Sequence, residues 1–168
     1  MLPKIIKDAI LTVEGRGYVG IIDNIEWPKI TRKTDEYRAG GMFGPVDIDL
    51  GQEKMELTFE ASEQTAEMIA LYGTCGLAGV KFRINASAES EMDCSGHGIE
   101  AVMTGRLKEI DLGTSKPGEL QKTKYTASLA TFKYSIDGRV LFDIDFPNNI
   151  CIINGTDMLE KRRANLKM

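Results

Sequence analysis

Residues 122–146 read KTKYTASLATFKYSIDGRVLFDIDF, and this stretch decides the fold class. Apolar and polar residues alternate on both sides of Asp137-Gly138, a dipeptide favoured in two-residue hairpin turns because both positions accept positive φ. The stretch therefore predicts two antiparallel strands, 122–136 and 140–146. Further strands are expected at 80–86 and 99–110, so the chain is predicted to be mainly β.

The N-terminal half predicts two more hairpins. In the first, strands 10–13 and 18–22 flank a glycine-rich turn. In the second, the alternating segments 46–50 and 55–60 face each other across a short loop. We interpret residues 31–60 as one long hairpin arm.

Two helices interrupt the strand pattern. Residues 62–72 change to a 3.6-residue period, with Ser62 as the expected N-cap and Gly73 as the end. A short, mostly polar helix is expected at 157–166. No repeat or linker divides the chain, so residues 1–168 are predicted to form a single domain.

The composition describes one soluble globular domain. The chain has 168 residues, 42% of them hydrophobic, and a formal net charge of -4. An acidic balance argues against a surface that binds nucleic acid by neutralising phosphates. Three cysteines without paired spacing argue against a disulfide framework. The N-terminus lacks an uninterrupted apolar run, so neither a signal peptide nor a membrane anchor is expected.

The sequence gives little support for a metal site or for a catalytic nucleophile. Cys94 and His97, with Asp93 beside them and Cys75 far away, fall short of the four convergent ligands of a structural zinc site. The single histidine lies in a glycine-rich loop, and no serine or cysteine has a recognisable catalytic context. No metal, cofactor or catalytic residue is expected, and the chain is not predicted to be an enzyme.

The carboxylates leave several interpretations open. Asp47 with Asp49, and Asp143 with Asp145, are pairs that project from one face of a strand. A glycosidase pair would come from separate elements around a cleft with aromatic platforms, and aromatic residues make up only 7% of this chain. The alternatives are a solvated strand face, or an acidic surface that must not bind a polyanion.

Four motifs, in register along the chain, resemble the major tail tube protein of contractile-tailed bacteriophages, a family shared with R-type tailocins. The motifs are KTDEYRAGGM at 33–42 with VDIDLG at 46–51, MTGRLKEID at 103–111, the segment 132–138, and the segment 144–157.

The resemblance implies a ring-forming protomer with a β-sandwich or barrel-like tail tube fold, one flanking α-helix and a short C-terminal helix. Homohexameric rings would enclose a continuous β-barrel and stack into the inner tube of the tail. The expected role is structural: a conduit for DNA ejection, or for membrane depolarisation in a tailocin.

The resemblance also implies partners and a location. The chain would contact further copies of itself, the tail sheath protein, the tape measure protein, and the baseplate and tail terminator proteins, while DNA would pass without specific binding. The protein would belong to the virion and be assembled in the host bacterial cytoplasm. The alternatives are a tube protein of a type VI secretion or related contractile injection system, and a small β-barrel enzyme or ligand carrier.

The arm supplies the expected subunit and ring contacts. Tyr37 and Arg38 are candidate anchors, Gly40 and Gly41 would allow close backbone approach, and Met42 follows them. The alternative is a mobile solvent loop.

The tube lumen would be lined by acidic side chains. We expect some of Asp47, Asp49, Glu56 and Glu60 to face the channel, where carboxylates repel DNA phosphates.

Overall fold

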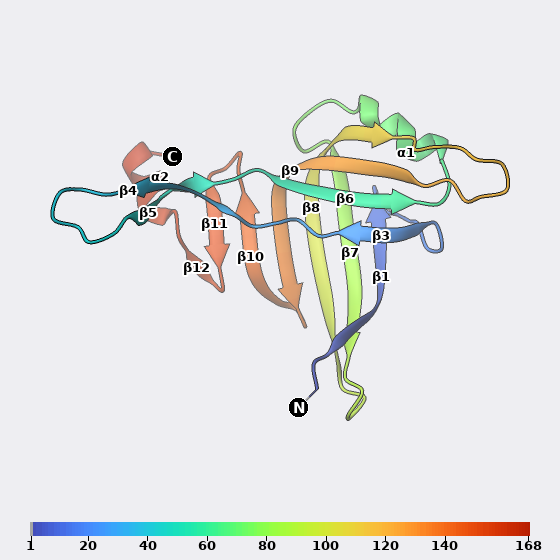
Figure 1. Ribbon diagram of the computed structural model, residues 1–168, viewed down its shortest axis with the longest axis horizontal. Helices are drawn as coiled ribbons and strands as arrows, with labels where there is room; N and C mark the ends of the chain where they lie inside the picture. The colour runs from blue at the N-terminus through green and yellow to red at the C-terminus, as the bar shows by residue number, and fades with distance from the viewer. Residues whose placement is uncertain (1) are drawn as a thin grey trace.

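Two sets of strands cross in the computed structural model, which describes residues 2–168 (Figure 1). One set runs along the long axis of the molecule and is called the lengthwise sheet. The other runs across that axis and is called the crosswise sheet. The crosswise strands, in spatial order, are β12 (Thr156–Asp157), β11 (Ile150–Ile153), β10 (Arg139–Asp145), β9 (Thr123–Ile136), β8 (Gly96–Asp111), β7 (Val80–Glu89), β1 (Ile5–Val13) and β2 (Arg16–Gly17).

The lengthwise sheet contains β3 (Ile22–Glu26), β6 (Met55–Ala61), and the parts of β9 and β8 nearest the loop that joins them. β9 is the central strand, because β8 follows it along its whole length while β6 and then β10 occupy its other side. β8 and β9 therefore belong to both sheets, so the two layers are one continuous hydrogen-bonded structure.

The bend between the sheets depends on a glycine. The β8–β9 pairing shifts register between Thr104 and Gly105, at the point where β8 passes from one sheet to the other. A Cβ at Gly105 would lie 2.2 Å from the Ser128 carbonyl oxygen. That distance is far inside van der Waals contact, so a side chain would force the two backbones apart.

The hydrophobic core lies between the two sheets. The burial of β6 and β7 alternates along the whole of each strand, as expected for strands with one face packed and one face in solvent. Phe59 stacks on Tyr125 with ring centroids 5.1 Å apart. The largest side chains that are less than 2% exposed are Leu11, Val13, Met55, Leu57, Phe59, Met68, Val80, Phe82, Ile84, Met103, Thr123 and Tyr125.

The mainly β fold and the hairpin at Asp137-Gly138 are confirmed. These two residues have φ of 49° and 80°, and β9 pairs with β10 across them. The strands predicted at 80–86 and 99–110 are β7 and β8, each longer than expected. Weakly patterned β11 and β12 were not predicted from the sequence.

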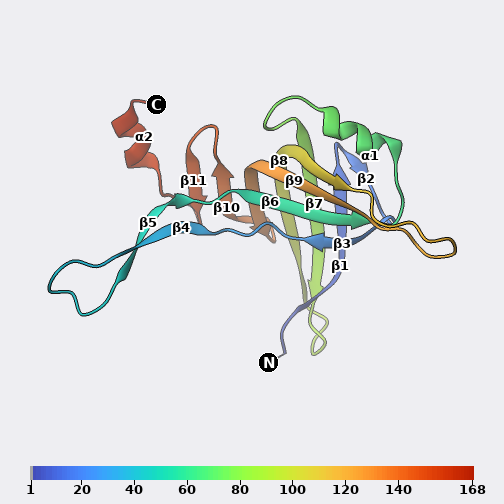
Figure 2. The ribbon, with the colours of Figure 1, turned by 45° about the horizontal axis from the view of Figure 1, so that its top comes forward.

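The long hairpin predicted between 46–50 and 55–60 is wrong. β5 (Val46–Gln52) pairs with β4 (Arg32–Tyr37), whereas β6 pairs with β3 and β9. The chain does not reverse after β5 but continues into β6 along the long axis (Figure 2). Two alternating segments separated by a break do not reveal whether the chain turns between them.

The first predicted hairpin is only partly correct. β1 and β2 pair around Glu14 and Gly15, both with positive φ. However, β2 is two residues long, and the predicted strand 18–22 is instead a turn that leads into β3. Tyr18 is buried in the core at this turn. The apolar residues of segment 18–22 therefore reflect packing in the core and not a paired strand.

The helices are shorter than the sequence pattern indicates. α1 (Ala66–Ala70) begins after Thr65, so Ser62 is not its N-cap. The Ser62 amide instead donates to the Ile21 carbonyl oxygen, just beyond the β3–β6 pairing. A 3₁₀ turn, η1 (Leu71–Gly73), follows and ends at the predicted glycine. α2 (Glu160–Leu166) ends the chain. Within residues 2–168, no helix is long and apolar enough to cross a membrane.

Candidate assembly surfaces

The hairpin of β4 and β5 extends from one end of the molecule as an arm, defined here as residues 32–52 (Figures 1 and 2). Its two strands pair with each other and with no other strand among the described residues. A two-stranded ribbon has little stability of its own in water. The arm is therefore a candidate contact segment.

The arm has one largely apolar face. Residues directly opposite each other in an antiparallel pair share a face, so Tyr37 and Val46 lie together, followed along β5 by Ile48 and Leu50. Asp35, directly opposite Ile48, is a charged residue on the same face. Their exposed fractions are 52%, 50%, 44% and 57%. Four large apolar side chains in a row on water-exposed strands favour burial against another protein surface.

The other face of the arm is acidic. Glu36 lies directly opposite Asp47, and Asp49 follows on the same face. Arg32 lies 3.7 Å from Asp49, measured from Nε to Oδ2, and Asp49 also accepts a hydrogen bond from the Gly51 amide at 2.8 Å. Like charges opposite each other destabilise a ribbon, so this face adds little to the stability of the arm.

The arm tip contains the other predicted contact residues. Arg38, Gly40 and Gly41 are exposed, and Gly41 has φ of 86°, which glycine adopts without strain. Met42 folds back, its sulfur accepting a hydrogen bond from the Ala39 amide at 3.2 Å. Phe43, which was not predicted as a contact residue, has a fully exposed side chain at the tip.

Both edges of the lengthwise sheet are open. Among residues 2–168, β3 pairs with β6 on one side only, and residues 106–111 of β8 pair with β9 on one side only. Unpaired backbone groups at an edge can accept a further strand. Glu26 on the β3 edge and Arg106 on the β8 edge make no ion pair within residues 2–168. The sequence pattern identifies such strands but not which of them remain at an edge.

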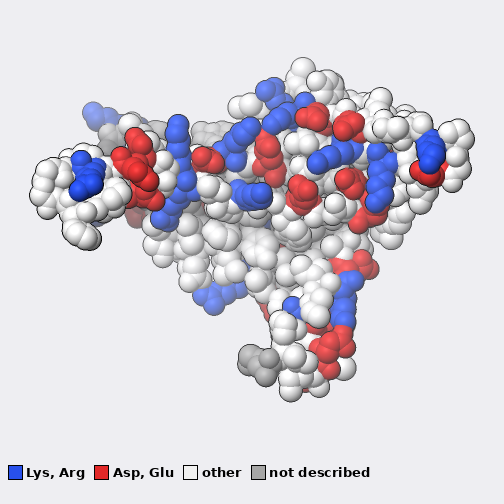
Figure 3. Space-filling view, viewed as in Figure 1, with Lys and Arg blue, Asp and Glu red and all other residues white. Residues whose placement is uncertain are grey.

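The outer face of the lengthwise sheet carries mixed charge. Glu56 on β6 pairs with Lys54 at 3.0 Å and with Lys108 on β8. The hydrogen bonds from Lys108 and Lys54 lower the pKa of Glu56, and Glu56 in turn raises the pKa of Lys108. Glu60 lies opposite Lys124 in the β6–β9 register. Figure 3 shows the two signs interspersed along this band.

The four carboxylates predicted for the lumen thus lie on two different surfaces. Asp47 and Asp49 are on the arm, and Glu56 and Glu60 are on β6 in the body. They do not form one acidic cluster, because the segments that carry them are consecutive along the long axis and not paired.

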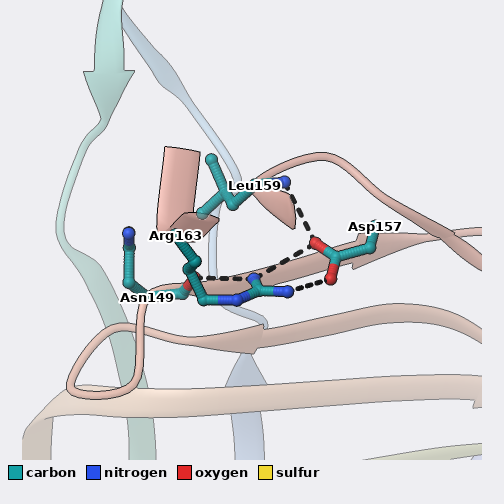
Figure 4. A network of polar contacts seen from close by, with 4 residues as sticks. All are labelled: Asn149, Asp157, Leu159 and Arg163. Carbon is teal, nitrogen blue, oxygen red and sulfur yellow. Dashed lines mark hydrogen bonds and ion pairs between the residues drawn. The ribbon is translucent and has the colours of Figure 1, made fainter. Parts of the chain in front are cut away.

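The C-terminal helix is held in place by a polar network (Figure 4). Arg163 pairs with Asp157 and donates to the Asn149 carbonyl oxygen at 3.0 Å, while the Leu159 amide donates to Asp157 at 3.0 Å. The hydrogen bond from Arg163 lowers the pKa of Asp157 and raises that of the guanidinium. The network joins α2 to β12 and to the turn before β11, which fixes this end of the crosswise sheet.

Groups suited to metal binding are dispersed. Within residues 2–168 no three His, Cys, Asp or Glu side chains converge as ligands. Cys94 and Asp93 lie in the turn between β7 and β8, His97 lies at the start of β8, and Cys75 lies in the loop before β7. Asp145 is engaged locally, accepting hydrogen bonds from Asn148.

Comparison with known proteins finds relatives that match nearly the whole chain. The phage tail tube protein FII family matches residues 3–166. The chain is 33% identical to the tail tube protein of Escherichia phage P2 over 98% of both chains. It is 31% identical to the major tail tube protein of Serratia phage KSP20 over 96% of this chain and 94% of that one.

Solved structures share the fold at low sequence identity. A chain of the sheath/tube terminator of an extracellular contractile injection system, PVC, aligns with TM-score 0.59 and 13% identity over 80% of this chain and 98% of its own. A chain of the PVC sheath-tube complex aligns with TM-score 0.55 and 13% identity over 76% of this chain and 87% of its own.

Proposed function

This chain belongs to the phage tail tube protein FII family, and on that premise we propose that it forms homohexameric rings that stack into the inner tube of a contractile tail. Its relatives are tail tube proteins and not enzymes. The observation that carries the ring proposal is the pair of open edges on the lengthwise sheet.

Ring closure would satisfy both edges at once. The β3 edge of one copy pairs with residues 106–111 of β8 in the next, and repetition of this head-to-tail contact closes by rotation. Glu26 and Arg106 carry opposite charges at the two edges, which favours the contact. The lengthwise sheets then form the inner wall as one closed β-barrel, and no edge is left for uncontrolled aggregation.

The barrel would have a definite width. Six copies of a four-stranded sheet, with strands about 4.8 Å apart and tilted by about 40°, give a backbone diameter of roughly 50 Å. Side chains narrow this channel, and the open centre serves as the conduit. In a phage tail, DNA would be ejected through this conduit. In a tailocin, the conduit would depolarise the target membrane.

The arm would join one ring to the next. It extends along the long axis, parallel to the strands of the proposed barrel wall, and so reaches out of the plane of its own ring. Tyr37, Arg38, Gly40, Gly41 and Met42 are the proposed contacts. Ring-on-ring contacts are open-ended, so the tube length must be set by other proteins.

The lumen wall would be the outer face of the lengthwise sheet, with Glu56 and Glu60 toward the channel. Pairing with Lys54 and Lys108 makes this wall mixed in charge and not uniformly acidic. The role of the carboxylates is then to occupy lysines that would otherwise bind phosphates, so that DNA slides without specific binding. Asp47 and Asp49 would reach the channel only where the arm borders it.

The partners would be those of a contractile tail. We infer contacts with a sheath protein outside the tube, a tape measure protein inside it, and baseplate and terminator proteins at its ends. The fold likeness to chains of a PVC sheath-tube complex and a PVC sheath/tube terminator supports this inference. The protein would be a virion component assembled in the host bacterial cytoplasm.

Electron microscopy of the purified chain, with light scattering for mass, tests the proposal. We expect hollow rings or tubes of uniform diameter with sixfold symmetry in class averages. Rings of another symmetry would contradict the hexamer. A chain that stays monomeric at high concentration, even when mixed with preformed tube ends, would contradict the tube.

A DNA-binding measurement tests the lumen wall. Tubes of the double variant Glu56→Gln/Glu60→Gln should retain short duplex DNA at low salt, and the retention should fall as salt is raised. The matched control is Asp143→Asn, on the crosswise sheet. Equal retention by wild-type and Gln-substituted tubes would place these carboxylates away from the channel.

A tube of a type VI secretion or related contractile injection system is the second candidate, favoured by the fold likeness to the PVC chains. Isolation of native particles separates the two. Tails attached to DNA-filled capsids would support the phage tail, whereas capsid-free assemblies loaded with protein would support the injection system.

A further inference from the structure

An apolar groove lies beyond the β3 edge, on the inner face of the crosswise sheet. It holds about 290 Å³, and its lining includes Ile6, Trp27, Pro28, Ile30, Tyr134 and Phe142. Trp27 packs edge-on against Tyr134 with centroids 6.0 Å apart, so its aromatic wall is preformed. Figure 3 shows a mostly uncharged surface on this side of the charged band. Exposed apolar grooves of this kind mark binding surfaces.

The groove begins where the lengthwise sheet stops. Trp27 and Pro28 follow directly on Glu26, the last residue of β3, and cover only part of the crosswise sheet beneath. Ile6 and Ile30 remain 47% and 36% exposed. The chain therefore lacks a covering layer just past one of its two open edges.

The opposite side of the molecule presents an apolar protrusion. η1 packs against β8, the strand that forms the other open edge. α1 lies beside the end of β1 that is remote from the N-terminus (Figures 1 and 2), where Glu67 pairs with Arg16 of β2 at 3.3 Å. Met68 is buried and Leu71 contacts the core, which anchors the segment. Tyr72 and Leu77 are 56% and 63% exposed.

We propose that the groove of one copy receives residues 69–77 of the next copy in the same ring, with Tyr72 and Leu77 as anchors. This inference rests on the proposed ring. When the β3 edge of one copy meets the β8 edge of its neighbour, the segment beside β8 is brought to the groove beside β3. One contact then buries two edges and two apolar surfaces.

Charge also fits this occupant. Lys29 lies between the groove residues Pro28 and Ile30, and Glu63 precedes α1. Neither makes an ion pair within residues 2–168. The apolar face of another copy's arm is the rival occupant. It fits less well, because the arm extends along the long axis and leads away from both edges.

Cross-linking through a native thiol tests the contact. Cys75 is exposed and lies within the proposed segment. The background variant carries Cys94→Ser and Cys151→Ser, and the test variant adds Lys29→Cys. In assembled tubes a short bis-maleimide, or oxidation to a disulfide, should join copies into a ladder that ends at the number of subunits in one ring.

Two controls make the result decisive. The background variant without Lys29→Cys should give no ladder. A rival variant replaces Cys75 with Ser and pairs Lys29→Cys with Ile48→Cys on the arm. Tubes that cross-link through Ile48→Cys and not through Cys75 would overturn the inference while leaving the proposed function intact. A wild-type chain that forms no ring would overturn both.

Assembly measurements give an independent readout. The double variant Tyr72→Ser/Leu77→Ser should need about a tenfold higher protein concentration for half-assembly, as expected when interface anchors are removed. Met92→Ser, at the tip of the β7–β8 hairpin with 67% exposure, is the matched control and should assemble normally. Equal assembly of both variants would overturn the inference.

Discussion

β5 and β6 are neighbours in sequence and have the same alternating pattern, but the apolar face of β6 is buried and that of β5 is exposed. β6 buries Met55, Leu57 and Phe59 to 1% exposure or less, while Ile48 and Leu50 on β5 remain 44% and 57% exposed. Alternation shows that a strand has one apolar face. It does not show what covers that face, which for β6 is its own chain and for β5 is, by our proposal, another copy.

The largest expected effect comes from a core residue. Phe82→Ala removes a side chain that is fully buried between the sheets and should lower the free energy of unfolding by about 3–5 kcal/mol. Urea denaturation monitored by circular dichroism measures the change. A loss below about 1 kcal/mol would mean that the core relaxes around the cavity, and would weaken the contrast with the arm.

The second-largest effect is expected at the bend between the two sheets. Gly105→Ala places a Cβ against the Ser128 carbonyl oxygen and should cost about 1–3 kcal/mol by displacing one backbone from the other. The same denaturation experiment reports it. Gly98→Ala, on the same strand with open space around its Cβ, is the control and should cost less.

The arm should behave in the opposite way to the core. Ile48→Ser should change the unfolding free energy of the isolated chain by less than about 0.5 kcal/mol, because the side chain is already in water. Assembly should nevertheless need about a tenfold higher concentration, since an interface anchor is lost. Val19→Ser, at another exposed site, is the control. A large loss of monomer stability would show that the arm packs on its own body.

The smallest effect concerns the C-terminal network. Asp157 has its pKa lowered from the ordinary 3.8, so its pairing with Arg163 stabilises the fold fully above that value. The contribution is lost as pH falls through the lowered pKa of the folded state. Amide chemical shifts of α2 should therefore change in acid, below about pH 4. In Asp157→Asn this transition should be absent; a transition that persists would assign it to another carboxylate.

Local patterns predicted several elements well. Asp137 and Gly138 form the expected turn because hairpin turns of two residues require positive φ, which this dipeptide accepts. β7 and β8 follow from alternation alone. Ser62 was wrongly expected to begin the helix, which begins after Thr65. Ser62 lies beside the residue before β3, where its amide donates to the Ile21 carbonyl oxygen, and helix-start patterns do not encode such a tertiary contact.

The assembly surfaces were predictable in part. The arm was predicted to be a contact element, which stays a prediction. Its partner strand was misassigned, since β4 (Arg32–Tyr37) is nearly all polar and gives a weak strand signal. Phe43 could have been found as an isolated aromatic in the glycine-rich stretch 40–44. The open edges of β3 and β8 could not, because whether a strand lies at an edge depends on every other pairing in the sheet.

The mainly β class, the Asp137-Gly138 hairpin and the resemblance to the tail tube family follow from the amino-acid sequence alone. These depend on turn chemistry, alternation and motifs, which are local along the chain. The pairing of β5 with β4, the central place of β9 and the identity of the open edges emerged only from the folded chain. The reason is that strand pairing joins residues far apart in sequence, and period-two patterns are the same for every possible partner.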